Sequence, residues 1–331
     1  MKRLFYGLAL SVLLVLSSCQ YHHDNGEIFH TSYHISYQHH RNLQKGIESN
    51  LQALDASLSM FNPNSTLSRI NQADTQAIDL SGDSLASHLI RQALRLSALT
   101  QGAFDITVAP LVNLWGFGYE HGSQPGQQRI DSILTFTGYR HLQLEGQLLR
   151  KDDARVKLDA SAIAKGYACD VVAGYLESKG VKNYLVEIGG EICLRGHNSQ
   201  GKLWTVGIDK PIDDPAALYR ELQTAIQLKD KCMATSGNYR NYYIDQGRKV
   251  VHTIDPASGY PVQHALLSAS VVADNCLTAD ALATSFMVMG LERAIALLRT
   301  QPDVWAYFIY RDQEGKLQTW CSPALEASII N

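Results

Sequence analysis

The segment that most constrains the fold is YLVEIGGEICLR, near the middle of the chain. Tyr184–Ile188 and Glu191–Arg195 are short runs rich in apolar residues, and the two glycines between them permit a tight turn. This pattern predicts two antiparallel strands joined directly. Elsewhere, helical and strand patterns alternate irregularly, with further strand pairs close in sequence. We therefore predict an α+β fold with antiparallel sheets, rather than a doubly wound parallel sheet.

The spacing of apolar residues predicts the remaining elements. Alternation with period two from Phe29 to Tyr37 indicates a half-exposed strand, whereas leucines at three- and four-residue steps indicate helices. Helices are expected at residues 43–60, 84–100, 161–179, 278–289 and 292–300, and further strands at 156–158, 204–208 and 304–311, the last strand of the chain. We expect Ser161 to be the N-cap of the third of these helices. The polar stretch 118–130, interrupted by glycine and proline, is expected to be a surface loop.

The N-terminus has the layout of a bacterial export signal. Lys2 and Arg3 precede a short apolar run, and Leu-Ser-Ser-Cys at residues 16–19 resembles a lipobox. This predicts a lipoprotein signal peptide at 1–18, lipid on Cys19, a polar tether over 19–27 and a single domain at 28–331. The protein would then be anchored by lipid to a bacterial membrane and face the periplasm. An ordinary cleaved signal or an N-terminal helix is the alternative interpretation.

Composition narrows the class of partner. The 331 residues can bury a large core, and the formal net charge is −3. Because there is no basic stripe with interleaved aromatic residues, nucleic acid is not expected as a partner. Six of the twelve histidines fall within residues 22–40. His30 and His34 would share a face of a strand but stand too far apart for one ion, so we expect these histidines to be solvated.

The cysteines show no metal-binding spacing. None of them forms a CxxC motif, and the five that follow Cys19 cannot all pair. We expect them mainly to be small buried hydrophobic residues. One disulfide remains open as an alternative. These five are Cys169, Cys193, Cys232, Cys276 and Cys321.

Two polar residues in TADALATSF have a spacing that suits a cation. Asp280 and Thr284 are four residues apart, so a helix places them on one face, one turn apart. A carboxylate and a hydroxyl so arranged can hold a hard cation such as Mg²⁺, which prefers oxygen ligands. Taken alone, the pair is more often a cap or a solvated face.

Three further segments carry polar groups at suggestive places. In LDASAIAKG, Asp159 stands at the mouth of a helix whose N-terminus favours anions, and Lys165 lies one turn inside; the alternative is a capped helix with Lys165 in solvent. In GAFDITVAP, Asp105 is either a site residue or a turn aspartate. In VVHTIDPASGYPV, His252 stands between a strand and a turn, where an isolated histidine is more often structural than catalytic. Walker A, GxGxxG, GxSxG and HExxH motifs are absent.

The order of these segments is more specific than any one of them. Seven blocks together resemble the ApbE family of FAD:protein FMN transferases, over about residues 29–298. The blocks are MFNPNSTLSRIN (60–71), GAFDITVAPLVNLWGFG (102–118), LDASAIAKGYACD (158–170), VEIGGEI (186–192), ATSGNYRNYY (234–243), HTIDPASGYPV (252–262) and TADALATSFMVMG (278–290).

The resemblance implies a reaction and its partners. Members use Mg²⁺ and transfer FMN from FAD to a Ser or Thr hydroxyl of a target protein, with release of AMP. The acceptor motif is roughly Asp-x-x-(Ser/Thr)-Gly-Ala-(Thr/Ser), on redox membrane subunits such as those of sodium-pumping NADH:quinone reductase and Rnf complexes. The implied fold is α+β, related to the tunnelling fold, with mixed sheets, packed helices and a flavin cleft between lobes. Two alternatives are a Mg²⁺-dependent FAD pyrophosphatase and a non-catalytic FAD-binding lipoprotein.

The resemblance also assigns roles to residues. It implies Asp280, Thr284 and the backbone carbonyl of Ala162 as magnesium ligands, and His252 as the group that acts in transfer. The residues implied for FAD binding are Phe29, Phe61, Ala103, Phe104, Asp105, Asp159, Lys165 and Ile254. Two positions depart from the family pattern. Phe29-His30-Thr31 stands where many members have Met-Gly-Thr, and Ala283 stands where some have a second carboxylate.

Overall fold

The protein's structure, a computed structural model, describes residues 20–118, 125–212, 221–239 and 241–330. The predicted signal peptide, Cys19 and residues 119–124 of the predicted loop lie outside the described residues. None of the helices described is both long and apolar enough to span a membrane.

An eight-stranded sheet forms the centre of the fold, and every strand pairing in it is antiparallel. The hairpin predicted from YLVEIGGEICLR is confirmed, with its two glycines at φ 62° and 99°. The strands, in spatial order, are β1 (Gln20–Ile28), β2 (Thr31–His39), β6 (Tyr184–Ile188), β7 (Glu191–Arg195), β10 (Cys232–Gly237), β13 (Leu266–Ala273), β14 (Trp305–Arg311) and β15 (Leu317–Cys321).

The described residues also form three smaller antiparallel sheets. Their strands are β8 (Trp204–Asp209), β9 (Leu222–Leu228) and β16 (Ile329–Ile330) in the first; β3 (Ala77–Asp79), β4 (Leu142–Glu145) and β5 (Leu148–Lys151) in the second; and β11 (Tyr242–Asp245) with β12 (Arg248–Val251) in the third.

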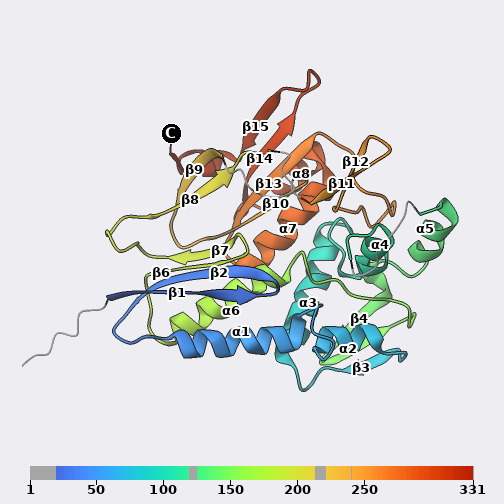
Figure 1. The fold of residues 1–331 in the computed structure, drawn as a ribbon, viewed down its shortest axis with the longest axis horizontal. Coiled ribbons are helices and arrows are strands. Elements are labelled where there is room, and N and C mark those ends of the chain that lie inside the picture. The colour runs from blue at the N-terminus through green and yellow to red at the C-terminus, as the bar shows by residue number, and fades with distance from the viewer. Residues whose placement is uncertain (1–19, 119–124, 213–220, 240, 331) are drawn as a thin grey trace, which may run out of the picture.

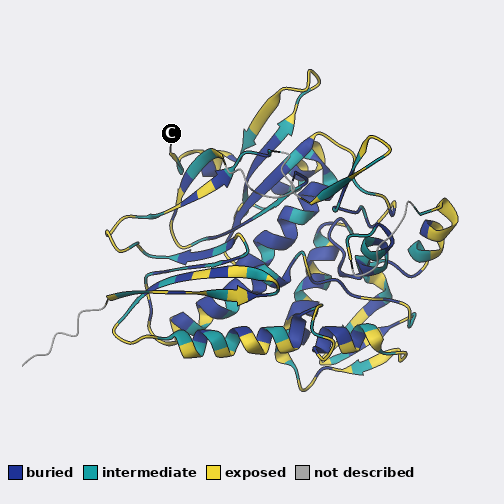
Figure 2. Ribbon diagram, in the orientation of Figure 1, coloured by how far each residue is buried: buried dark blue, intermediate teal, exposed yellow. Residues whose placement is uncertain are grey.

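Two buried helices position the site. α7 (Cys276–Met289) packs on β10 and β13 and against α6 (Ala164–Ser178), and α6 packs in turn against α1 (Gln44–Leu58). α7 is apolar on nearly all sides, as expected of a helix enclosed in a core, and Figure 2 shows it inside the molecule. The other helices are α2 (Thr66–Gln72), α3 (Ser84–Leu99), α4 (Ala109–Leu114), α5 (Gln127–Leu134), α8 (Leu291–Leu298) and α9 (Pro323–Glu326), with 3₁₀ turns η1 (Ile106–Val108) and η2 (Tyr139–His141).

The part of the large sheet from β7 to β14 is covered on both faces, and its side chains alternate between two cores. One face of β7 and β10 presents Cys193 and Cys232 to the core with α6 and α7. The opposite face presents Leu194 and Met233 to β8, β9 and α9. A third cluster joins α4 and α5 to β12 and Ile254. The α+β class with antiparallel sheets is therefore confirmed (Figure 1).

The prediction of a tether over residues 19–27 is wrong for the part described. Residues 20–28 form β1, which pairs with β2 along its whole length. β1 is an edge strand with one face in solvent, so its composition is polar although its backbone is fully paired. Phe29 and His30, placed in a strand by their alternation, instead form the two-residue turn of this hairpin, with φ 50° and 58°.

Other elements predicted from the sequence also differ from those in the structure. Residues 156–158 are not a strand, and Ser161 does not cap α6; Ile163 holds that position and makes no side-chain cap. Residues 304–311 are not the last strand, since β15 and β16 follow. All five cysteines within the described residues are free, and Cys321 alone among them is not buried.

Candidate active site

A cleft of about 710 Å³ lies where the N-terminus of α6, the middle of α7 and the end of β10 meet two loop segments. The loops carry residues 103–108 and 252–256. Ligand sites for small molecules commonly fall between roughly 300 and 1,000 Å³. Residues from six of the seven sequence blocks, all except 60–71, therefore line one space of ligand size.

Asp280 and Thr284 both line this cleft, as their spacing on one helix face predicted. Asp280 is 3% exposed, and its Oδ2 accepts a hydrogen bond from the Gly166 amide at 2.9 Å. Its Oδ1 has no hydrogen-bond partner among the residues described. Burial raises the pKa of Asp280, and the nearby Lys165 ammonium acts against that rise. The hydroxyls of Thr284 and Ser236 lie 3.1 Å apart.

Gly166 explains how α6 and α7 approach so closely. A Cβ on Gly166 would lie 2.4 Å from the Cys276 carbonyl oxygen and 2.7 Å from the Asp280 Cβ. Both distances are shorter than real Cβ contacts, so only glycine fits without moving a helix. The close approach is what allows the Gly166 amide to reach the Asp280 carboxylate.

Lys165 lies in the cleft and pairs with a buried carboxylate, so its alternative placement in solvent is wrong. Its Nζ donates to Glu191 Oε1 at 2.5 Å. Burial would lower the pKa of Lys165, but Glu191 and Asp280 outweigh it and raise that pKa. Burial raises the pKa of Glu191 to about 7, while Lys165 opposes the rise.

Asp280, Glu191 and Lys165 form a group of two carboxylates and one ammonium. Glu191 is 3% exposed, and its Oε2 is buried without a hydrogen-bond partner in the described structure. With Asp280 and Glu191 both ionised, Lys165 balances only one negative charge. These residues provide an oxygen-rich set of donors, which suits a hard divalent cation. The set consists of Glu191 Oε2, Asp280 Oδ1 and the hydroxyls of Thr284 and Ser236. Ala162, the predicted third ligand position, also lines the cleft.

Asp159 lies at the mouth of α6, as predicted. Its backbone amide donates to the Ile106 carbonyl at 2.7 Å, which ties this segment to η1. Its Oδ1 accepts from both the amide and the hydroxyl of Ser161. Burial raises the pKa of Asp159, and these two hydrogen bonds act in the opposite direction.

His252 lines the same cleft and directly follows the end of β12. Its Nδ1 lies 3.0 Å from the Asn241 carbonyl oxygen. Because a carbonyl can only accept, Nδ1 carries the proton and Nε2 keeps a lone pair. Burial lowers the pKa of His252; the Asn241 bond opposes this and the charge of Lys165 adds to it. The ring is therefore neutral near pH 7, with one basic nitrogen.

Asp105 lines the cleft but is fully engaged in local structure. Its Oδ1 accepts from the amide and hydroxyl of Thr107 at 2.8 and 2.7 Å, and its Oδ2 accepts from the Tyr139 amide at 2.6 Å. It caps η1 and links that turn to η2. The geometry thus matches the turn-aspartate interpretation, while contact with FAD stays a prediction.

The remaining predicted residues divide between two spaces. Ala103, Phe104 and Ile254 line the main cleft. Phe29 and Phe61 instead line an adjoining pocket of about 280 Å³, which shares Asp159, Ser161 and Lys165 with the cleft. The Phe61 ring is 54% exposed and stacks on His30, with ring centroids 4.2 Å apart. His30, the departure from the family pattern, thus supports the aromatic wall of this pocket.

Comparison with known proteins agrees with this arrangement. The model of the ApbE family matches residues 29–308. The chain belongs to the ApbE family. A relative named FAD:protein FMN transferase from Vibrio cholerae is 40% identical over 303 residues, covering 88% of this chain and 89% of the relative. One of the same name from Escherichia coli is 37% identical, covering 87% and 82%.

Solved ApbE structures show the same fold. The flavin transferase ApbE of Vibrio cholerae superposes with a TM-score of 0.82 at 35% identity, covering 94% of this chain and 99% of that one. The apo flavinyl transferase ApbE of Pseudomonas stutzeri gives a TM-score of 0.82 at 32% identity, covering 94% and 97%.

Several residues of this ApbE-family cleft were not singled out from the sequence. They include Thr31, Glu191, Thr235, Ser236 and Asn241. Glu191 follows the Gly-Gly turn inside a block that carries the family resemblance, and that position was the available signal. Asn241 acts through its backbone carbonyl, so its side-chain type gave no signal.

Proposed function

We propose that this protein transfers FMN from FAD to a hydroxyl group of a target protein and releases AMP. The observation that carries the proposal is the composition of the cleft. One space of ligand size holds an oxygen-rich acidic group, a half-buried lysine and a neutral histidine. These are the groups that phosphoryl transfer requires, since its catalysis rests on positioning and charge neutralisation. The names of the relatives given above support the same reaction.

We propose Asp280, Thr284 and the Ala162 backbone carbonyl as the residues that hold Mg²⁺. The oxygen donors fit this ion, and Glu191 Oε2 is a further buried, unpartnered oxygen in the same cleft. When bound, Mg²⁺ neutralises charge on the pyrophosphate and makes the departing AMP a better leaving group.

The protein's own residues would bind and orient the FAD pyrophosphate. Backbone amides at the N-terminus of α6 favour a phosphate, and Lys165 adds a positive charge one turn inside. The Glu191 carboxylate holds the Lys165 side chain in place. The aromatic pair of Phe61 and His30 offers a flat surface beside the cleft for one of the two ring systems of FAD.

His252 would accept the proton of the attacking hydroxyl. The Asn241 carbonyl fixes the tautomer, so Nε2 is the basic atom. A lowered pKa keeps the ring unprotonated at neutral pH, as a general base requires. The attacking oxygen then forms a bond to the FMN phosphorus while the bond to the AMP oxygen breaks.

The acceptor and the location are further parts of the proposal. We propose a Ser or Thr hydroxyl within a motif close to Asp-x-x-(Ser/Thr)-Gly-Ala-(Thr/Ser), on a redox membrane subunit. Lipid on Cys19 would hold the enzyme at a bacterial membrane, facing the periplasm. The export-signal layout of residues 1–19 supports this location.

The test combines the protein with FAD, Mg²⁺ and a small protein that carries the acceptor motif. The expected result is flavin fluorescence that stays on the acceptor in a denaturing gel, together with one AMP per labelled acceptor. A matched acceptor with alanine in place of the motif hydroxyl is the control. AMP and free FMN without labelled acceptor would indicate a pyrophosphatase. Bound FAD without any AMP would indicate a carrier.

A further inference from the structure

A second group of metal-ligating side chains lies outside the set of residues that line the cleft. It consists of Asp170 on α6, Cys193 on β7 and Cys232 on β10. One ligand atom from each lies within 4.8 Å of the other two. Among the residues that the structure describes, this is the one cluster of three such side chains so closely spaced. The proposed reaction uses none of them.

Strand register fixes the two sulfurs side by side. Cys193 and Cys232 are directly opposite each other in the antiparallel pairing of β7 and β10. The neighbouring Leu194 amide donates to the Lys231 carbonyl at 3.0 Å, so the cysteines form the adjacent non-hydrogen-bonded pair. Residues in such a pair are close, about 4.5 Å between Cα atoms, and their side chains share a face. Both thiols therefore meet α6 on the same side of the sheet.

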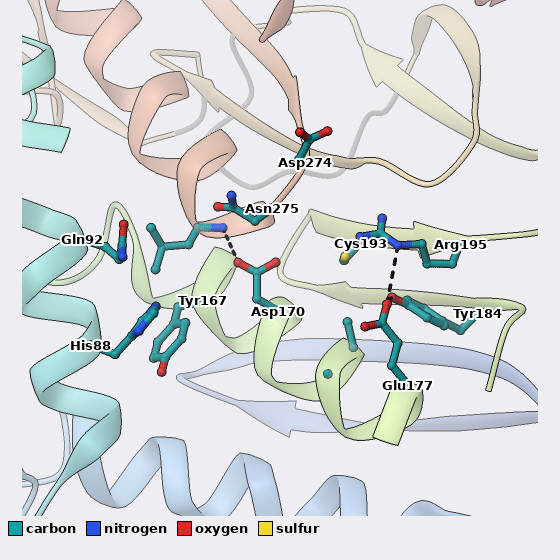
Figure 3. A pocket seen from close by; sticks show the side chains of 13 residues that line it. His88, Gln92, Tyr167, Asp170, Glu177, Tyr184, Cys193, Arg195, Asp274 and Asn275 are labelled. Carbon is teal, nitrogen blue, oxygen red and sulfur yellow. Dashed lines mark hydrogen bonds and ion pairs between the residues drawn. The ribbon is translucent and has the colours of Figure 1, made fainter. Parts of the chain in front are cut away.

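The third donor is held rigidly in front of them. Asp170 Oδ1 accepts from the Cys276 amide at 2.7 Å. Its Oδ2 accepts from the Leu277 amide at 2.8 Å, which is the dashed line at Asp170 in Figure 3. Each carboxylate oxygen has a further lone pair, so these bonds orient the carboxylate without exhausting it. Outer hydrogen bonds of this kind are a regular feature of metal ligands. The Cys232 sulfur already lies 4.0 Å from Oδ1.

Charge and access also suit a cation at this point. Two thiolates and one carboxylate carry three negative charges, and a divalent ion leaves one. Arg195 interacts electrostatically with both cysteines, so it can balance that charge. Asp170, Cys193 and Arg195 line a pocket of about 340 Å³, which gives an ion a path from solvent (Figure 3).

From this arrangement we infer a structural metal site, formed by Asp170, Cys193 and Cys232, for one thiophilic divalent ion of the zinc class. Sulfur and carboxylate ligands favour Zn²⁺ over Mg²⁺ or Ca²⁺. A water molecule from the pocket that Asp170 and Cys193 line would complete the coordination of the ion. Each thiol releases its proton as its sulfur binds the ion, so the ion replaces two protons.

The site would stabilise the scaffold of the cleft. It joins α6, β7 and β10 directly, and it reaches the N-terminus of α7 through the amides that bind Asp170. Those four elements carry Lys165, Glu191, Ser236 and Asp280, respectively. An ion here would hold them together without touching the substrate.

The test uses the full chain, reduced and freed of metal with a chelator, and titrated with Co²⁺. We expect one equivalent to produce the intense near-ultraviolet absorption of thiolate bound to Co²⁺, and Zn²⁺ to abolish it by displacement. We also expect Zn²⁺ to raise the thermal unfolding midpoint by several degrees. Cobalt bound at an oxygen site would not produce the thiolate band.

Matched variants make the result decisive. Cys232→Val keeps a small apolar side chain in the core, and it should lose both the thiolate band and the Zn²⁺ shift. Cys321→Ser, outside the cluster, should retain both. The inference is overturned if the reduced protein shows no thiolate band, or if Cys232→Val shows the same band. It is equally overturned if Cys193 and Cys232 are isolated as a disulfide and bind no ion after reduction.

Discussion

Asp105 and Asp280 line the same cleft, yet their surroundings are opposite. Asp105 receives three hydrogen bonds that satisfy both oxygens, whereas Asp280 receives one on Oδ2 alone. Burial raises the pKa of both carboxyls. Satisfied oxygens hold the local chain, and an unsatisfied buried oxygen costs free energy unless a ligand occupies it. Asp105 therefore stabilises the local structure of the cleft, whereas Asp280 has an oxygen available to a cation.

The largest effect is expected at Asp280. Asp280→Asn keeps an oxygen that can accept from the Gly166 amide but removes the negative charge. Metal stabilisation of a phosphoryl group is worth several kcal/mol, so FMN transfer should fall by at least about 10²-fold and lose its dependence on Mg²⁺. The unfolding free energy should change by less than about 1 kcal/mol. Transfer that still responds to Mg²⁺ would place the ion elsewhere.

The next effect is expected at His252. His252→Ala should reduce transfer by about 10²-fold or more, because a positioned general base typically contributes that much. FAD binding, measured by fluorescence titration, should be unchanged. In the wild type, transfer should fall on the acid side with a midpoint below 6.5, the ordinary pKa of histidine, since burial lowers the pKa of His252. An acid limb that persists in His252→Ala would assign it to another group.

The opposite outcome, a loss of stability with little loss of transfer, is expected at Asp105. Asp105→Ala removes the acceptor for the amides of Thr107 and Tyr139 and leaves them unpaired. We expect the unfolding free energy to fall by about 1–3 kcal/mol, measured by urea denaturation. Transfer at saturating FAD should fall much less than in Asp280→Asn. If Asp105→Ala is as stable as the wild type but loses transfer as completely as Asp280→Asn, the distinction between the two aspartates fails.

Helix-local features of the site were predictable from the sequence, and contacts across the fold were not. The spacing of Asp280 and Thr284 placed both on one face because helical geometry is local. Glu191 gave no such signal, because a carboxylate at the start of a strand is ordinary until Lys165 is known to lie beside it. Phe29 and His30 continue the alternating pattern of a strand, yet the chain turns at these two residues. A two-residue turn does not have to interrupt the alternation of apolar residues, so the pattern did not reveal it.

The same reasoning applies to the edges of the fold. The polar composition of residues 20–27 suggested a tether, although β1 is stabilised by backbone pairing that side-chain composition does not report. Ser161 suggested a helix cap, but its amide and hydroxyl bind Asp159 instead. In both cases the hydrogen-bond partner became clear only in the folded chain. The partner is the backbone of β2 for β1, and the Asp159 carboxylate for Ser161.

The smallest effect on transfer is expected from the pairing of Glu191 with Lys165, which instead appears as a pH dependence of stability. In the metal-free protein the pKa of Glu191 is raised to about 7, from an ordinary 4.5, so the folded state binds its proton more tightly than the unfolded state. The stabilisation is therefore complete below about pH 4.5 and is lost as the pH rises through 7, by at most about 1.4 kcal/mol per pH unit.

Glu191→Gln should flatten this dependence of the unfolding free energy on pH, measured by urea unfolding between pH 4.5 and 7.5. Added Mg²⁺ should also flatten it, because a cation beside Glu191 favours the ionised carboxylate in the folded state. A slope that survives in Glu191→Gln would show that the excess negative charge of the cleft resides on another group, and the contrast with the satisfied Asp105 would then rest on Asp280 alone.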